Sequence, residues 1–424
     1  MHQTRWIAAG LLMSAAACLA ELGDTVSPSP DHPAIGYFNY LKHSLRDPVS
    51  ELNRKLQQGA VQLQFENGTG YLRTVLEALH VPIESQMAVF SKTSLQFARI
   101  EPTNPRTIFF TDAVAVAWVR GGFIELASHD PQMGVIFYSL EQDHVGRPEF
   151  LRRDDCLRCH ISEVSLGVPG MMVRSRYTTT DGMPKLIYGG YATDHRSPLE
   201  ERWGGWYVTG DAGKARHMGN AVVTDDGPES MVTDRTLHVK SLAGKFDTAA
   251  YVSPHSDIAA LLVFDHQMYM TNLLTRVGWE TRAALYDKRR DLAVRLRENA
   301  TELVDYLLFV DEAPLAGRIE GTSGFAERFG GQGPRDSRGR SLRQLDLETR
   351  LLRYPCSYMI YTEAFDSLPA EARTAIYRRM WQILSGAEKA GKYARLTLAD
   401  RQAVVEILRE TKKGLPEYFQ AVTR

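Results

Sequence analysis

The chain has few cysteines, no excess of charge and no internal repeat. Only 4 of its 424 residues are cysteine, and 50 basic residues balance 51 acidic ones to give a net charge of −1. This balance provides no electrostatic basis for nucleic acid as the main partner. The sequence contains no internal repeat of 20–50 residues, so it does not predict a solenoid or a propeller. No nucleotide-binding glycine loop, catalytic triad or second metal motif stands out.

Long hydrophobic runs are also lacking. The apolar stretch Trp6–Ala17 is too short to span a bilayer, follows the positive start His2 and Arg5, and leads to small residues before Glu21. This pattern predicts a signal peptide at residues 1–20, an exported protein in a periplasmic or similar compartment, and no membrane span in the mature chain. Cys18 offers an alternative, because "AAAC" loosely resembles a lipoprotein cleavage site; it would give a lipid anchor and a membrane-tethered lipoprotein.

Removal of the leader leaves three cysteines, too few for a disulfide scaffold. Two of them form the motif "CLRCH", in which Cys156 and Cys159 are followed directly by His160. Two thiols at this spacing can add to the two vinyl groups of a porphyrin, and the adjacent histidine can bind the iron. Export supports this interpretation, because such haem is attached after export. The remaining Cys356 has apolar neighbours, so we expect a buried, unreactive thiol.

Two other chemistries use closely spaced cysteines. Structural zinc usually has four ligands, and the sequence has no second cysteine pair. A thioredoxin-like redox pair begins a helix after a strand of a βαβ unit, whereas here the preceding "GRPEFLRRDD" predicts a polar helix from Pro148. Both patterns fit less well than haem attachment.

The motif behind a signal peptide resembles the haem-binding motif of c-type cytochromes. Stretches such as "TDHRSPLEERWGGWYVTG" and "HMGN" also resemble large, poorly characterised bacterial proteins with a cytochrome c domain. The resemblance implies one covalent haem c, with thioethers at Cys156 and Cys159 and His160 as the proximal iron ligand. It implies one-electron transfer with a periplasmic redox partner. The alternative is a haem-dependent oxidoreductase or ligand sensor whose distal site is open; the length of the chain favours more than a bare carrier.

The distal ligand is the least determined part of the predicted site. His217 in "RHMGN" is our first candidate, because it lies in a glycine-bounded segment that could bend toward a ring. A Met ligand raises the reduction potential of the haem and suits electron transfer, whereas a His ligand lowers the potential. An empty position permits ligand binding. The other candidates, each with an ordinary packing role as its alternative, are Met218, His195, Met171, Met172, His266 and Met270.

Aromatic and basic residues downstream could also contact haem. Trp203, Trp206 and Tyr207 could pack on its edge, although strand packing explains them equally well. Arg174 and Arg176 could pair with the propionates, or serve a structural role.

The pattern of apolar residues predicts an α+β fold, with an antiparallel β-rich N-terminal half that carries the haem motif and a mainly α-helical C-terminal half. Short apolar runs separated by turn residues predict the sheet between about residues 86 and 142. Ser256 and Asp257 offer an N-cap for a long helix, with a break near Gly278. Thr397 and Asp400 form a capping box for the last helix. We divide the chain into a flexible leader (21–35), a haem-bearing α/β domain (36–255) and a helical domain (256–424). Residues 321–341 are expected to form a loop.

Overall fold

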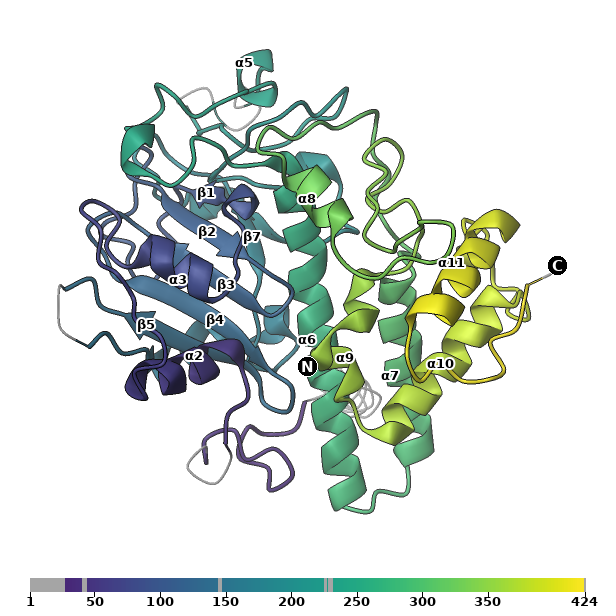
Figure 1. Ribbon diagram of the computed structural model, residues 1–424. Helices are drawn as coiled ribbons and strands as arrows, with labels where there is room; N and C mark the ends of the chain where they lie inside the picture. Colours follow the sequence, from purple (N-terminus) through teal and green to yellow (C-terminus); the bar gives the residue numbers. More distant parts are fainter. Residues whose placement is uncertain (1–26, 40–43, 144–146, 225–226, 228–231, 423–424) are drawn as a thin grey trace, which may run out of the picture.

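The structure is a computed structural model that describes residues 27–39, 44–143, 147–224, 227 and 232–422. The predicted signal peptide (1–20), Cys18 and the first part of the leader lie outside these ranges. Within them, an antiparallel sheet occupies the N-terminal half and most helices lie in the C-terminal half (Figure 1), so the α+β prediction is confirmed.

The main sheet has the strand order β6-β5-β4-β3-β2-β1-β9, and a separate hairpin pairs β7 with β8. Each apolar run between residues 86 and 142 forms a strand, as predicted, because these runs are rich in β-branched and aromatic side chains and end at turn residues. The strands are β1 (Met87–Val89), β2 (Arg106–Phe110), β3 (Val114–Trp118), β4 (Ile124–Asp130), β5 (Gly134–Leu140), β6 (Leu151–Arg152), β7 (Val173–Arg176), β8 (Gly190–Thr193) and β9 (Trp206–Tyr207).

Helices cover both faces of this sheet. On the first face, α2 (Pro48–Gln57) packs on β4, and its N-cap Asp47 accepts a hydrogen bond from the Tyr138 hydroxyl at 2.8 Å. On the other face lies α6 (Ile258–Tyr286), where Phe264 packs on Phe110 with ring centroids 5.0 Å apart. Of the two N-cap candidates, Asp257 is the cap: its side chain accepts hydrogen bonds from the first turn of α6.

Further helices pack around α6 in the C-terminal half (Figure 1). In α11, Thr397 and Asp400 form the predicted capping box. The buried core is continuous across residue 255, because strands and α6 contribute to the same hydrophobic cluster. The remaining helices are α3 (Leu72–Ala78), α4 (Leu157–His160), α5 (Asp234–Leu237), α7 (Leu292–Leu307), α8 (Phe325–Gly331), α9 (Glu363–Asp366), α10 (Ala370–Leu384) and α11 (Leu398–Thr411).

Three local predictions are wrong. The long helix passes through Gly278 without a break, because its fully buried turns are held by packing on both sides of that glycine. The segment from Pro148 forms no helix; it joins the sheet edge as β6, where Leu151 pairs with Ser139 of β5. The expected loop at 321–341 contains α8, which buries Phe325 and Phe329. In all three, tertiary packing outweighs local propensity.

Among the described residues, no helix combines the length and apolar character that crossing a bilayer requires.

Candidate haem-attachment site

The motif forms a short helical turn directly after the edge strand β6. A 3-10 turn, Asp154–Cys156, leads into α4, and Leu157 anchors it by being buried in the core. The Arg153 guanidinium pairs with Asp155 at 2.8 Å, which fixes the entry to the turn. The two motif cysteines are free thiols, Cys159 exposed and Cys156 half-buried, so both sulfurs are available for bond formation.

The His160 imidazole is held by the segment that follows it. Its Nδ1–H donates to the Gly170 carbonyl at 2.8 Å, while the Gly170 N–H donates to the His160 carbonyl at 3.0 Å. The imidazole also packs on the Phe137 ring of β5, with centroids 4.6 Å apart. Burial lowers the pKa of His160, which favours the neutral form that binds metals. A backbone carbonyl on Nδ1 leaves Nε2 as the free ligand atom, the usual arrangement of a metal-bound histidine.

Asn272 of α6 fixes the position of the Gly170 carbonyl. Its side-chain amide accepts from the Met171 N–H at 3.0 Å and donates to the Met171 carbonyl at 2.7 Å. There is no room for a side chain at Gly170, because a Cβ atom there would lie 2.1 Å from Asn272 Oδ1. The orientation of His160 therefore depends on contacts between residues more than 100 positions apart in the chain.

Gly170→Ala is expected to lower the free energy of unfolding by about 1–3 kcal/mol, since Asn272 must move to admit the methyl group. Urea unfolding of the purified protein measures the change. Gly331→Ala is the matched control, because a Cβ atom at Gly331 meets nothing within 4 Å. Equal stability of the two variants would contradict the tight contact.

The surroundings of the motif cysteines do not favour a redox pair or a zinc site. Burial raises the pKa of the Cys156 thiol to about 11, whereas a nucleophilic redox cysteine needs a lowered value. Zinc needs several converging ligands, and no three His, Cys, Asp or Glu side chains among the described residues lie close enough to hold a metal ion. Cys356 is fully buried, as predicted.

His217 and Met218 lie behind the hairpin strand β7. His217 is buried against Trp203, with ring centroids 5.4 Å apart, and burial lowers its pKa to about 4. The Met218 sulfur accepts from the Ser175 hydroxyl at 3.5 Å, on the inward face of β7. Arg174, whose charge acts on His160, lies on the outward face of the same strand. In the described part of the chain, no hydrogen bond or ring contact joins either distal candidate to His160.

The other histidine candidates belong to a separate buried cluster. His195 and His266 share a hydrogen bond of 2.7 Å between their Nδ1 atoms, and His266 Nε2 bonds the Ser357 hydroxyl at 2.7 Å. Both rings stack on Tyr306. Met270 is fully buried on α6.

The methionines and arginines just after Gly170 lie beside the motif. Met171 is held through its backbone by Asn272, and the Met172 sulfur accepts from Arg174 Nε at 3.1 Å. Trp206 Nε1 donates to the Arg174 carbonyl at 2.8 Å, so its indole supports the strand from behind. Met171, Met172 and Arg174 are thus available as lining for a haem.

Sequence reasoning missed two charged residues close to the motif. The Arg106 guanidinium and the Glu125 carboxylate form an ion pair of 2.8 Å on the sheet face that also carries Phe137. Both charges influence the pKa of His160, and Glu125 that of Cys156. Their signal in the sequence was a charge inside each of two otherwise apolar strands, "RTIFF" and "IELASHD".

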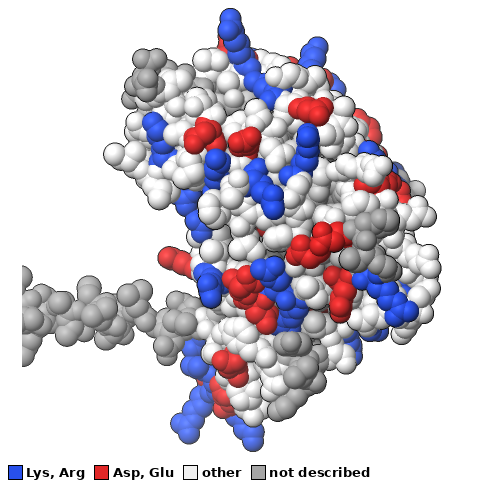
Figure 2. Space-filling model, turned by 90° about the vertical axis from the view of Figure 1, so that its left-hand side faces the viewer, with Lys and Arg blue, Asp and Glu red and all other residues white. Residues whose placement is uncertain are grey.

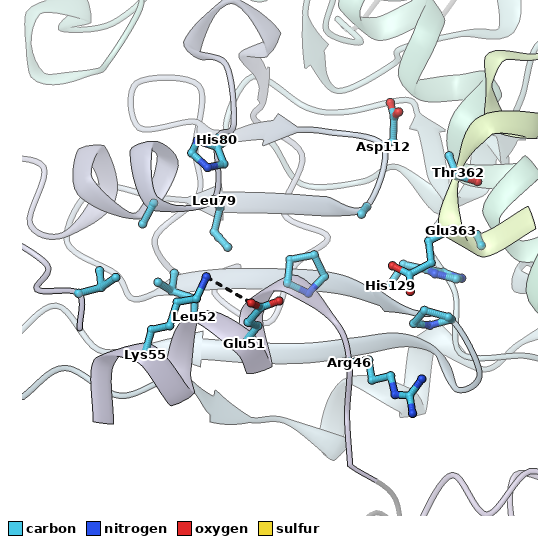
Figure 3. Close-up of a pocket in the computed structure, with 16 residues that line it drawn as sticks. Arg46, Glu51, Leu52, Lys55, Leu79, His80, Asp112, His129, Thr362 and Glu363 are labelled. Atoms are coloured by element: carbon cyan, nitrogen blue, oxygen red, sulfur yellow. Dashed lines mark ion pairs between the residues drawn. The ribbon is translucent and has the colours of Figure 1, made fainter. Parts of the chain in front are cut away.

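A separate cavity of about 530 Å³ lies between α2, α3 and α9 and includes none of the motif residues (Figure 3). Its charged side chains are of both signs, and Lys55 pairs with Glu51 at 3.2 Å (Figure 3). Asp112, also on its wall, pairs with Arg343. Because the charges largely neutralise one another, the cavity indicates no particular ligand.

Comparison of the chain with protein-family models, curated proteins and solved structures finds no match.

Proposed function

We propose that this chain is an exported c-type haem protein that carries one covalent haem. Cys156 and Cys159 form the thioethers, and His160 provides the proximal ligand through Nε2. The observation that carries the proposal is the hydrogen bond from His160 Nδ1 to the Gly170 carbonyl beside two free thiols. It orients the imidazole and keeps Nε2 free for iron.

When bound, haem supplies an iron that changes its charge by one electron. The protein residues hold it and set its surroundings. Leu157 and Phe137 keep the motif on the sheet, the Asn272 amide fixes the Gly170 carbonyl, and Arg174 on the outward face of β7 is a candidate partner for a propionate.

One-electron transfer with a periplasmic redox partner is the function we propose for this haem. The face shown in Figure 2 carries basic and acidic side chains interspersed over its surface. A face without one dominant sign of charge gives little electrostatic steering to a partner. Cleavage at residue 20 would release the protein, and lipidation of Cys18 would tether it to a membrane.

A haem enzyme or ligand sensor with an open distal site is the second candidate. The observation that favours it is the position of His217 and Met218 behind β7, with partners unrelated to His160. A site without a strong second ligand permits ligand binding.

Expression of the full chain with a haem-attachment system tests the proposal. We expect purified protein whose intact mass includes one haem and whose pyridine haemochrome spectrum is that of a c-type haem. A spectroelectrochemical titration should then follow a one-electron curve. Colourless protein with two free thiols at Cys156 and Cys159 would overturn it.

A further inference from the structure

One face of the main sheet is less well covered than the other. On the face that carries Phe137, five apolar side chains keep between 6 and 9% of their surface exposed. Their neighbours on the opposite face are between 0 and 2% exposed. The first group is Ile108, Ala115, Ala117, Ala127 and Phe137, and the second is Thr107, Phe109, Val116, Leu126 and Ile136.

The less covered side chains form a floor beside the motif. Three of the five are alanines, in neighbouring strands β3 and β4, so this part of the sheet has small side chains. Two other residues of the same face are covered: Phe110 by α6, and Val135 by the segment around Pro169. The open part is therefore the part that extends from His160 away from α6.

The hydrogen bonds of His160 give the direction of its free nitrogen. Nδ1 points to Gly170, whose neighbour Pro169 accepts from the Val135 N–H at 3.2 Å, at the start of β5. Nε2 is on the opposite side of the ring from Nδ1, so it faces away from Gly170 and Pro169. The ligand atom for iron therefore lies on the side of the imidazole that Gly170 does not occupy.

Arg106 and Glu125 form the polar part of this floor. They come from β2 and β4, and Arg106 reaches Glu125 across β3, where the small side chain of Ala117 leaves room. The Ser94 hydroxyl donates to the Glu125 carboxylate at 3.0 Å. Arg106 Nε is buried and has no hydrogen-bond partner in the described part of the chain. A donor of a charged group buried without a partner is unfavourable unless a ligand accepts from it.

The segment after Ser94 carries two exposed apolar side chains. Leu95 and Phe97 are 54% and 56% exposed, although Gln96 between them is tied to the backbone of Phe123. Leu95 follows directly after Ser94, whose hydroxyl bonds the Glu125 carboxylate.

On the described face of these strands, the only His or Met side chains are Met87, closed off with the core at the end of the row, and His129. His129 Nε2 lies 3.4 Å from the Thr275 hydroxyl of α6, at the far end of β4 from Glu125. On the described residues of these strands, therefore, no imidazole and no exposed thioether lies beside Arg106 and Glu125.

We propose that Arg106 and Glu125 line the distal side of the haem, and that the sixth position of the iron takes a small anion to which Arg106 donates a hydrogen bond. Glu125 is a positioning residue that holds the guanidinium in place. This inference rests on the haem attachment proposed above, and assigns the ligand class of the open site.

Fluoride binding to the ferric holo-protein tests the assignment, since fluoride is a small anion that accepts hydrogen bonds. We expect wild-type protein to be high-spin and to bind fluoride, and Arg106→Leu to raise the dissociation constant about 10- to 100-fold, the usual effect of losing a hydrogen bond between charged groups. Carbon monoxide, which is neutral, should bind both reduced proteins with similar affinity. Arg120→Leu is the control, because Arg120 forms an exposed ion pair with Asp247.

The variant Glu125→Gln distinguishes a ligand-binding role of the Arg106–Glu125 pair from a purely structural role. It keeps an acceptor for Arg106 but removes a negative charge, so fluoride should bind more tightly, opposite to the effect of Arg106→Leu. Shifts in the same direction would indicate a structural role and overturn the inference. Arg106→Lys, which keeps the charge and loses the planar fork, serves if Arg106→Leu fails to fold, and should weaken binding less.

The two proposals fail in different ways. Protein without covalent haem would overturn the attachment at Cys156 and Cys159. Protein with covalent haem that is low-spin, and that ignores both fluoride and carbon monoxide, would overturn only the distal site of Arg106 and Glu125.

Discussion

Protein in which both Cys156 and Cys159 are replaced by alanine is expected to carry no covalent haem, whereas each single variant keeps one thioether at most. The physical reason is that each sulfur adds to one vinyl group, and a vinyl group left unreacted shifts the haemochrome spectrum. Acid–acetone extraction should release all haem from the double variant and none from the wild type. Intact mass and the pyridine haemochrome spectrum measure the two effects.

Cys356→Ala is the matched control for these variants. Cys356 is fully buried in the core, so a vinyl group of a haem has no access to its sulfur. This variant should keep the full covalent haem content and lose only the packing of one sulfur. If Cys356→Ala lost haem to the same extent as Cys156→Ala, the motif would not be the attachment point.

The elements that the sequence predicted correctly are those with strong local patterns. The five strands between residues 87 and 140 are apolar runs with turn residues at both ends, and the caps of α6 and α11 depend on residues within three positions of the helix start. Gly278 shows the limit of this reasoning. A glycine inside a helical pattern weakens the helix, but here packing of the whole helix in the core outweighs that loss.

The candidate site also contains residues that the sequence predicts and residues that it does not. Its three motif residues are adjacent in sequence and were predicted from spacing alone. The Gly170 carbonyl and the Asn272 amide lie 10 and 112 positions beyond His160, and sequence spacing carries no information on such contacts. Arg106 and Glu125 could have been found, because a charge inside a buried strand is rarely present without a partner.

His217 shows why a flexible-looking segment is a weak guide to a ligand. "RHMGN" has the glycine that a bend needs, yet Met218 packs against Gly204 and His217 against Trp203, so the segment is part of the packing behind β7. Its role as distal ligand stays a prediction, and the fluoride and carbon monoxide measurements address it, because a bound imidazole would block both ligands.

The second large effect, a loss of folding stability, is expected on replacing Asp265, a residue of α6 that is surrounded by buried polar partners. Its carboxylate is fully buried and accepts from Arg202 Nη1 at 3.2 Å, Trp203 Nε1 at 3.1 Å and the Thr193 hydroxyl at 3.2 Å. Burial raises the pKa of Asp265 to about 6, although Arg202 opposes this shift. These contacts tie the hairpin strand β8 and the segment after it to α6.

Asp265→Ala should lower the free energy of unfolding by about 3–5 kcal/mol, because it leaves the Arg202 guanidinium buried without its counter-charge. Asp265→Asn should cost less, since the amide oxygen still accepts hydrogen bonds. Replacing Arg202 by leucine in the Asp265→Ala background should recover part of the loss, because the remaining buried charge is then removed as well. Urea unfolding followed by circular dichroism measures all three variants.

Asp247→Ala is the control for a carboxylate paired at the surface. Its partner Arg120 lies 3.5 Å away and both side chains are more than half exposed, so we expect a loss of about 0–1 kcal/mol. The contrast between Asp265 and Asp247 isolates burial, since each replacement removes one carboxylate from one arginine. Equal losses at the two positions would mean that Arg202 finds water or another acceptor in the variant, and that Asp265 does not hold the hairpin on α6.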